Sequence, residues 1–269
     1  MTREKLFDQL WMDYIQFNLA AEKIVFLFKQ RGEIIVNDHI AFRTFNDSRI
    51  NIEKFKSHFI PLGYEEVGDY DFKVKKLSAI HLEHKFDMHA PKIFISQLRL
   101  EEFSDYLQDT VQEILNQVSP EQLYNYGFVF SGRLWNTPSY KTYQKLREES
   151  EYAAWLYAFG FRANHFTINV NQLNSFTDLF EVNEYLKENG FHLNTYGGEI
   201  KGSKEKLLEQ SSTLASKVKV GFSEGLYEIP GCYYEFARRH VNKLGEQFNG
   251  FIADSANKIF ESTDISIQR

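Results

Sequence analysis

The sequence holds a single cysteine, Cys232, so no disulfide can form within the chain. It has no apolar run of the roughly 18 residues that a membrane-spanning helix needs. Its first residues, MTREKLFDQL, lack the basic and then apolar order of a secretory signal peptide. Together these absences predict a cytoplasmic protein with no membrane partner.

A basic balance is absent as well. The 31 Lys and Arg residues are outnumbered by 37 Asp and Glu residues, which gives a formal net charge of −6. Nucleic-acid-binding proteins usually carry a basic patch or stripe, so we expect no nucleic-acid partner. The sequence also lacks G-x-S-x-G, H-E-x-x-H, Walker A and G-x-G-x-x-G motifs, which disfavours serine hydrolases, zincins, P-loop proteins and Rossmann folds.

Aromatic residues, by contrast, are plentiful. They make up 16% of the chain, and 25 of them are phenylalanines. Because aromatic side chains mostly serve packing, this composition predicts a phenylalanine-rich core, with an aromatic-lined cavity as the alternative. A chain of 269 residues is long enough for one large domain or two small ones. We expect a single domain over residues 1–269.

The predicted elements occur twice in the same order. The first copy runs from a strand at 38–45 through a helix at 51–59 to short strands that end with PKIFISQL. The second copy runs from a strand at 164–170 through a helix at 175–189 to strands that end with CYYEFARR. A further helix is expected near 203–211 in the second copy. An internal repeat of this kind decides the fold class.

Each copy therefore consists of a strand, a helix and three strands. The repeat predicts an α+β fold in which paired βαβββ units form a curved mixed sheet around one cleft. We expect the repeat-like halves at about 35–100 and 160–240. Extra helices are expected at the N-terminus and in a helical connection at 101–160.

Both copies open with a histidine near the start of a strand, in NDHIAFRTF and ANHFTINV. If the first and last strands of each half line the cleft, then His39, Gln97, His165 and Glu235 come within reach of one point. Two imidazoles and one carboxylate are the donors of a non-haem Fe(II) site, and they leave other positions open for substrate and dioxygen. The pattern supports a metal site made by His39, His165 and Glu235.

Each member of this set also has a structural explanation. A histidine at a strand start is more often a hydrogen-bonded structural residue than a ligand. Glu235 could pair with Arg238 or Arg239 at the surface. A carboxylate between Tyr234 and Phe236 is nevertheless costly to bury without a partner, which favours a metal.

Arg43 lies on the same strand face as His39 and would point into the same cleft. A guanidinium there could hold a substrate carboxylate through two parallel hydrogen bonds, which makes Arg43 a candidate catalytic and substrate-binding residue. The structural alternative is a salt bridge from Arg43 to Asp38 or Glu66.

Further candidates lie in loops and strand ends. Arg133, in SGRLWNTPSY, and Ser211, in EQSST, are candidates for substrate binding, although capping of a helix end is the default for Ser211. His81, His84 and His89, in AIHLEHKFDMH, could form another metal site. We expect a solvated strand end instead, because the two-residue period of a strand places His81 and His84 on opposite faces.

Several blocks resemble the 2-oxoadipate dioxygenase/decarboxylase family, namely NDHIAFRTF, LSAIHLEH, SGRLWNTPSY, EYAAWLYAFGFRANHFTINV, FEVNEYLKENGFHLNTYGGEIKGS and IPGCYYEFARRH. The resemblance extends over about residues 35–240, and the family is similar to the vicinal-oxygen-chelate enzymes, which have paired βαβββ units. It implies Fe(II) bound by His39, His165 and Glu235, with a substrate carboxylate bound by Arg43.

The resemblance also implies the partners and the reaction. A 2-oxo acid and dioxygen are the implied partners, and 2-oxoadipate would be converted into 2-hydroxyglutarate and CO2 in lysine catabolism. Gln97 stands where many relatives have glutamate, which implies a three-ligand iron site and a contact of Gln97 with the substrate or with a ligand.

Other points stay open on the sequence. Many relatives are longer, so the identity of the 2-oxo acid is not fixed. Zn, Ni or Mn could occupy the same donors in a purified sample. A metal-dependent isomerase or hydrolase on the same scaffold and a non-catalytic small-acid-binding module are the alternatives. The oligomeric state is not indicated.

Overall fold

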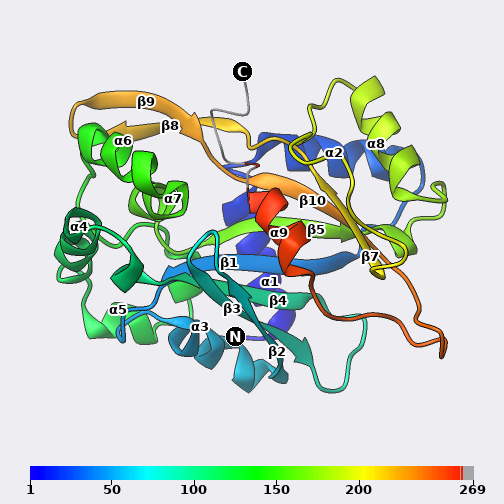
Figure 1. Ribbon diagram of the computed structural model, residues 1–269, viewed down its shortest axis with the longest axis horizontal. Coiled ribbons are helices and arrows are strands. Elements are labelled where there is room, and N and C mark those ends of the chain that lie inside the picture. Colours follow the sequence, from blue (N-terminus) through cyan, green and yellow to red (C-terminus); the bar gives the residue numbers. More distant parts are fainter. Residues whose placement is uncertain (261, 263–269) are drawn as a thin grey trace.

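The computed structural model describes residues 1–260 and residue 262, and its centre is an eight-stranded mixed sheet (Figure 1). The strands follow one another in the order β2-β3-β4-β1-β5-β10-β7-β6, and β8 and β9 form a separate hairpin. The strands are β1 (Asn37–Phe45), β2 (Tyr64–Phe72), β3 (Leu77–His84), β4 (Lys92–Leu98), β5 (Ala163–Asn169), β6 (Lys201–Ser203), β7 (Leu208–Ser212), β8 (Lys217–Phe222), β9 (Gly225–Pro230) and β10 (Tyr233–Arg239).

The sheet consists of two equivalent halves joined at its middle. β1 pairs with β4 in parallel, and β5 pairs with β10 in the same way. β1 and β5 are antiparallel neighbours, so the order β2-β3-β4-β1 continues as its mirror image, β5-β10-β7-β6. This arrangement confirms the predicted α+β fold of paired βαβββ units in a curved mixed sheet.

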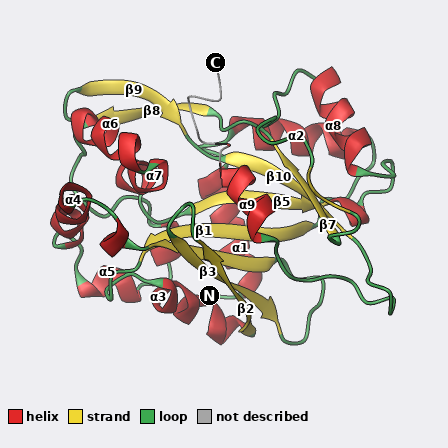
Figure 2. Cartoon of the chain, in the orientation of Figure 1, coloured by secondary structure: helices red, strands yellow, loops and turns green. Residues whose placement is uncertain are grey.

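Helices cover both faces of the sheet (Figure 2). α1 and α2 pack behind the central strands β5 and β10, whereas α9 crosses the opposite face. No described helix is long and apolar enough to cross a membrane. The helices are α1 (Arg3–Tyr14), α2 (Leu19–Gln30), α3 (Ile52–Phe59), α4 (Asp105–Leu115), α5 (Pro120–Tyr124), α6 (Tyr140–Glu149), α7 (Glu151–Phe159), α8 (Leu179–Glu188) and α9 (Ala253–Phe260), with short 3-10 segments η1 (Ile60–Leu62), η2 (Leu100–Glu102), η3 (Phe128–Phe130) and η4 (Val170–Gln172).

Local signals in the sequence place several helix ends correctly. The Asn51 side chain accepts a hydrogen bond from the Lys54 backbone N–H at the start of α3. Gly63 ends the turn that follows α3 with a φ of 94°, a left-handed conformation that glycine adopts without strain. Ser119 and Gln122 form a reciprocal capping box at the start of α5. These contacts set the boundaries at Asn51, Gly63 and Ser119, and the first agrees with the helix expected at 51–59.

The helix predicted near 203–211 is wrong. This segment forms the β6-β7 hairpin, in which Lys201 pairs with Gln210. The letters KEKLLEQ favour a helix locally, but pairing of β7 with β10 buries Leu208 and the end of the strand, and tertiary packing outweighs local preference. β6 and β7 are therefore the counterparts of β2 and β3, and the additional element of the second half is the β8-β9 hairpin.

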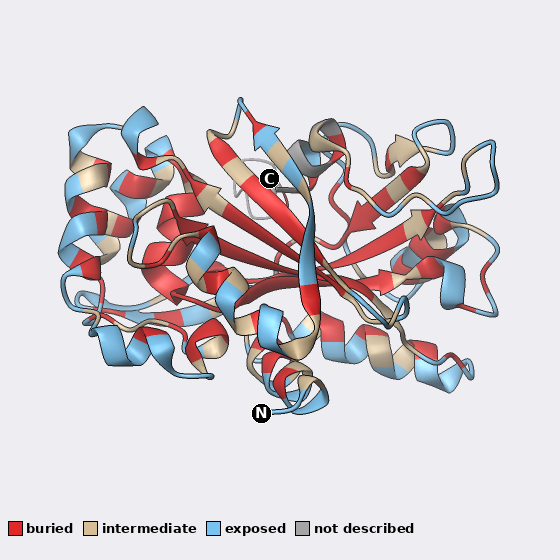
Figure 3. Ribbon diagram, turned by 90° about the horizontal axis from the view of Figure 1, so that it is seen from below, coloured by how far each residue is buried: buried red, intermediate tan, exposed pale blue. Residues whose placement is uncertain are grey.

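The central strands are buried on both faces, as the middle of the sheet in Figure 3 shows. Every residue of β1 after Asn37 is buried. Phe42 packs against Phe55 and Phe59 of α3, with ring centroids 5.8 and 5.5 Å apart. The predicted phenylalanine-rich core is thus present directly behind the strand that carries His39.

The organisation of the whole chain as one domain stays a prediction. Because both halves contribute strands to one sheet, we expect circular dichroism and tryptophan fluorescence to report coincident unfolding transitions. Phe42→Ala should lower the free energy of unfolding by about 3–5 kcal/mol in both signals, because it leaves a cavity between β1 and α3.

Phe86→Ala is the matched control for this experiment. The Phe86 side chain is 90% exposed, so its loss should change the free energy of unfolding by less than about 0.5 kcal/mol. Two separated transitions, or a Phe42→Ala effect on one signal alone, would contradict a single domain.

Candidate metal centre

Three strands of the sheet bring His39, His165 and Glu235 together. The Nε2 atoms of the two histidines are 3.3 Å apart, and the Glu235 carboxylate oxygens lie 3.6 Å from His39 Nε2 and 3.3 Å from His165 Nε2. One donor atom from each residue lies within 4.8 Å of the others. In the part of the chain that the structure describes, no other group of His, Cys, Asp and Glu side chains meets this geometry.

Strand register explains this convergence. β1, β5 and β10 are neighbours at the centre of the sheet, and His165 pairs with Ala41 on one side and Tyr233 on the other. Side chains alternate between the faces of a strand, so residues two positions from these partners, His39 and Glu235, point to the same face as His165. The three donors therefore share one face of the sheet.

Burial sets the protonation of the three donors, whose exposed fractions are only 1–3%. It lowers the pKa of both imidazoles, which keeps them neutral and able to donate a lone pair. It also raises the pKa of Glu235 to about 8. A divalent cation between these side chains would offset the cost of burying the carboxylate, so the donor set fits a metal ion.

Two neighbouring side chains form hydrogen bonds with the candidate ligands, and sequence reasoning missed both. The Gln210 amide donates a hydrogen bond to Glu235 Oε1. Asp38 Oδ1 accepts one from His39 Nδ1 at 2.8 Å. Asp38 directly precedes His39 in NDH, and this adjacency was the available signal. No local signal pointed to Gln210, because it depends on the true register of β7.

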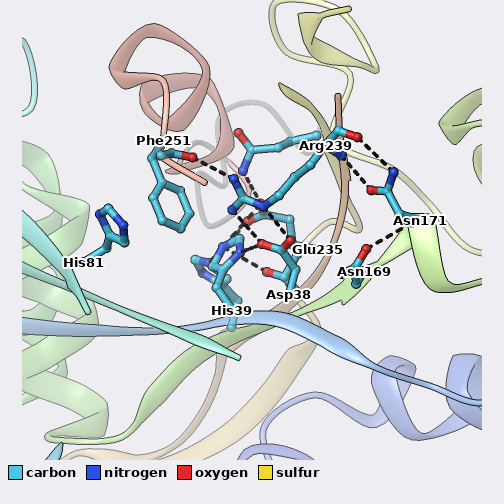
Figure 4. A network of polar contacts seen from close by, with 12 residues as sticks. Asp38, His39, His81, Asn169, Asn171, Glu235, Arg239 and Phe251 are labelled. Carbon is cyan, nitrogen blue, oxygen red and sulfur yellow. Dashed lines mark hydrogen bonds and ion pairs between the residues drawn. The ribbon is translucent and has the colours of Figure 1, made fainter. Parts of the chain in front are cut away.

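The three candidate ligands line a small cavity of about 20 Å³, which is room for about one water molecule. The other walls are Phe94, Gln210, Phe251 and Ile259. Phe251 stands edge-on to the His39 ring, with ring centroids 4.8 Å apart (Figure 4). Phe251 and Ile259 lie at the two ends of one stretch, here called the C-terminal segment. This segment covers the site on the face of the sheet that carries the candidate ligands.

Arg43 is 2% exposed and lies farther along β1 on the same face as His39. Its guanidinium carbon stands 5.0 Å from the centroid of the Tyr152 ring and 5.2 Å from that of the Trp155 ring. Among the described residues, its Nε and Nη1 atoms have no hydrogen-bond partner. Its charge also contributes to the lowered pKa of His165, after burial and the charge of His39. Arg43 is thus a buried cation close enough to His165 to affect its pKa, although it does not line the cavity, and no described carboxylate forms an ion pair with it.

The structural alternatives for Arg43 and Glu235 are not what the structure shows. Asp38 forms its ion pair with Arg239, and Glu66 forms one with a lysine of α3. Glu235 is not at the surface, and among the described side chains its polar contacts are with the two histidines and a glutamine.

Gln97 lies away from the ligands. Its side chain accepts a hydrogen bond from the Ile52 backbone N–H at 3.0 Å and donates one to Ser78 Oγ at 3.1 Å. Strand alternation accounts for this, because Gln97 is three residues beyond Phe94, and an odd spacing places the two side chains on opposite faces.

Strand pairing identifies the true first-half counterpart of Glu235. Glu235 lies two residues after the pairing partner of His165. The residue two positions after the pairing partner of His39 is Phe94. The repeat therefore offers four equivalent positions, but only three carry a metal-binding side chain, and an apolar ring occupies the fourth.

Ser211 and Arg133 also lie elsewhere. Ser211 Oγ donates a hydrogen bond to Asn183 of α8 at 2.6 Å, on the face opposite to the ligands. Arg133 donates to the backbone carbonyl of Ala158 at 3.2 Å, near the end of α7. Neither residue lines the cavity.

His81, His84 and His89 do not assemble into a metal site within the described residues. His81 contacts the Tyr70 hydroxyl at 2.9 Å and Glu83 at 3.2 Å, whereas His84 accepts hydrogen bonds from backbone N–H groups of the next turn. The separation of His81 from His84 by the strand period is confirmed. The expected solvation is wrong for His81, which is buried under the C-terminal segment.

The fold defines the class of protein. A protein from Ralstonia eutropha JMP134 that is assigned to the glyoxalase superfamily has a TM-score of 0.77 and 20% sequence identity. The match covers 91% of this chain and 84% of that protein. At this identity the likeness concerns the fold alone, and it agrees with the paired units described above.

The family is shown by more similar proteins. A family model described as 2-oxoadipate dioxygenase/decarboxylase matches residues 16–247. The "2-oxoadipate dioxygenase/decarboxylase, chloroplastic/amyloplastic" of Oryza sativa subsp. japonica is 34% identical over 274 residues, which cover 93% of this chain and 75% of the relative. The chain belongs to the 2-oxoadipate dioxygenase/decarboxylase family, and it is an enzyme.

Two solved structures are similar over nearly their whole length. A hydroxyglutarate synthase from Oryza sativa, solved in complex with 2-oxoadipate, is 32% identical with a TM-score of 0.92 and covers 98% of this chain and 92% of that chain. A protein from Shewanella frigidimarina NCIMB 400, whose proposed class is hydrolase, is 48% identical with a TM-score of 0.89 and covers 93% and 97%.

The ligand assignment predicts the metal content of three variants. His39→Ala, His165→Ala and Glu235→Ala should each weaken metal binding by more than the roughly 10–100-fold that loss of an outer hydrogen-bond partner costs. Metal per chain after dialysis measures the effect. His240→Ala, which removes a histidine that contacts Glu209 instead, should keep the wild-type metal content. Full metal retention in all three variants would refute the assignment.

The position of Phe94 predicts a gain of binding and a loss of turnover. Phe94→Glu should tighten metal binding, because a second carboxylate then stands at the position equivalent to Glu235. It should slow turnover at least about tenfold, because the added ligand occupies a position that the substrate needs. Phe94→Leu is the control and should keep wild-type metal affinity. Equal metal affinity of Phe94→Glu and Phe94→Leu would contradict the equivalence.

Proposed function

We propose that the chain is an Fe(II)-dependent dioxygenase that oxidatively decarboxylates a 2-oxo dicarboxylic acid, with 2-oxoadipate as the substrate and 2-hydroxyglutarate and CO2 as products. One atom of dioxygen enters the carboxylate formed at the keto carbon, and the other enters the hydroxyl group on the next carbon. The atoms balance without a further reductant. A role in lysine catabolism and a cytoplasmic location are parts of this proposal.

The observation that carries the proposal is the buried Arg43 guanidinium, which shares a strand face with His39 and has two nitrogen atoms without a hydrogen-bond partner among the described residues. A buried cation without an anion is costly, so a carboxylate of the ligand is its natural partner. Arginine binds carboxylates through two parallel hydrogen bonds. The related synthase that was solved with 2-oxoadipate holds an acid of this kind.

Bound iron would supply the positions to which the keto oxygen, the neighbouring carboxylate and dioxygen bind, together with the electrons that activate dioxygen. The residues of the chain prepare that site. His39, His165 and Glu235 would hold the metal, and Phe94 offers no donor atom at the fourth equivalent position. Gln210 orients Glu235 through its hydrogen bond to Oε1.

The C-terminal segment keeps water away from the reacting atoms. Phe251 and Ile259 stand over the ligands, and the space that remains is about 20 Å³. A six-carbon acid needs far more room than the one water molecule for which this space suffices. We infer that Phe251 and Ile259 move aside when the acid enters and then pack against it, which excludes water from the closed site.

A metal-dependent hydrolase on the same scaffold is the second candidate, because hydrolase is the class proposed for the Shewanella relative. Oxygen consumption separates the two functions. A dioxygenase loaded with Fe(II) releases one CO2 for each dioxygen consumed in the presence of 2-oxoadipate. A hydrolase turns over without dioxygen, and activity that persists under argon would refute the proposal.

The role of Arg43 predicts a kinetic pattern. Arg43→Lys and Arg43→Ala should keep bound iron but lose at least about tenfold in kcat/KM for 2-oxoadipate, because a charged hydrogen bond contributes about 1.5–3 kcal/mol. Lysine should rescue only in part, since it lacks the planar fork of arginine. If Arg43 binds the distal carboxylate, the loss should be much smaller for 2-oxohexanoate, the monocarboxylic acid of equal length.

Arg31→Lys is the matched control for these variants. Arg31 also lies between two aromatic rings, 4.7 Å from the centroids of Phe176 and Tyr185, but it is exposed and remote from the ligands. Its substitution should leave kcat/KM unchanged. Equal losses for both acids would instead place Arg43 at the carboxylate next to the keto group, and unchanged kinetics would remove it from the site.

A further inference from the structure

The His39 ring contacts the Asp38 carboxylate, and this carboxylate contacts the Arg239 guanidinium (Figure 4). Asp38 Oδ1 lies 2.8 Å from His39 Nδ1. Arg239 binds both oxygens of that carboxylate, with Nε 2.7 Å from Oδ2 and Nη2 2.8 Å from Oδ1. The exposed fraction of each of these side chains is at most 5%. These contacts thus connect the arginine to the carboxylate and the carboxylate to the imidazole, which faces the proposed metal position.

The contact with Asp38 fixes which nitrogen of His39 carries the proton. A carboxylate only accepts hydrogen bonds, so Nδ1 must be the protonated nitrogen. In a neutral imidazole, Nε2 then carries the lone pair and faces the other ligands. Thr167 Oγ1 lies 3.0 Å from Nε2 and can donate to it, which agrees with this tautomer.

Hydrogen bonds hold both the backbone and the guanidinium of Arg239. Its backbone N–H donates to Asn171 Oδ1 at 2.8 Å, and its carbonyl accepts from Asn171 Nδ2 at 2.9 Å. Its Nη1 atom donates to the backbone carbonyls of Phe248 and Gly250, at 3.1 and 2.8 Å. The Gly250 carbonyl immediately precedes Phe251, which stands against the His39 ring. One guanidinium therefore holds both the partner of His39 and the segment that covers it.

We propose that Asp38 and Arg239 are positioning residues for the metal. Asp38 selects the His39 tautomer with a free Nε2 lone pair and fixes the direction of the ring, and Arg239 fixes Asp38. This inference rests on the proposed metal site, since it concerns how one ligand of that site is presented. Partners of this kind orient a ligand and increase its basicity, and their loss typically weakens metal binding by about 10–100-fold.

A purely structural role for the pair predicts different results. In that case the variants would lower the stability of the protein, but the properly folded fraction would bind metal as the wild type does. The test must therefore report on the ligand itself. Two readouts do so, namely the protonation of the His39 ring and the visible absorption of Co²⁺ bound in the site.

The first experiment uses the wild-type protein without metal. In protein labelled with ¹⁵N-histidine, nuclear magnetic resonance should show His39 protonated on Nδ1 and not on Nε2. A ring protonated on Nε2 would overturn the proposal. This measurement does not depend on whether any variant folds.

The second experiment titrates variants with Co²⁺. Asp38→Ala should weaken Co²⁺ binding about 100-fold, and Asp38→Asn and Arg239→Lys about tenfold, within the range expected for such partners. The absorption bands of bound Co²⁺ should shift in the Asp38 variants. Asp38→Asn keeps the size of the side chain, so it decides the question if Asp38→Ala does not fold.

Glu209→Gln is the matched control for the Co²⁺ titration. It alters another carboxylate that contacts a histidine, with Glu209 Oε2 2.8 Å from His240 Nε2, on the same sheet but away from the ligands. This variant should bind Co²⁺ as the wild type does. Asp38 variants within twofold of the wild type would overturn the positioning role.

The proposed metal site and the proposed positioning role of Asp38 and Arg239 can fail separately. If His165→Ala and Glu235→Ala lose Co²⁺ while the Asp38 variants keep it, the metal site holds and the positioning role is wrong. If His165→Ala and Glu235→Ala also bind Co²⁺ normally, the metal site itself is wrong.

Discussion

The burial of Glu235 between two neutral imidazoles is the constraint on which the rest of the site depends. A carboxylate in the middle of a sheet costs free energy unless a positive charge compensates it, and no lysine or arginine among the described residues forms an ion pair with it. The neighbouring features make sense together with a bound cation. Both imidazoles stay neutral, an amide steadies the carboxylate, and apolar side chains close the space above.

The fold was largely predictable because its signals are local or periodic. Asn51 and Ser119 cap the helices that directly follow them in the sequence. The alternation in β1 and β5 follows from strand geometry. The repeat then determined how the halves combine. The segment 203–211 could not be predicted in this way, because its strand conformation depends on pairing with β10, which lies far along the chain.

The site was predictable only where position in the repeat was enough. His39 and His165 begin equivalent strands, so the sequence indicates both. Predictions that depended on strand register were less accurate, because a shift of one residue moves a side chain to the opposite face. The structure therefore has Phe94 where Gln97 was expected, and Gln210 rather than the candidate Ser211 contacts Glu235. Such choices are made by long-range pairing, which one sequence does not reveal.

The origin of the donors in three separate strands has a consequence for how the protein matures. His39 and His165 are 126 residues apart, and such long-range contacts form slowly because loop-closure entropy opposes them. A metal held by these three side chains would therefore bind only after both halves have been synthesised and docked. Once bound, such a metal would stabilise the assembled sheet by RT ln(1 + [L]/Kd), so the stability of the protein would then depend on the supply of the ion.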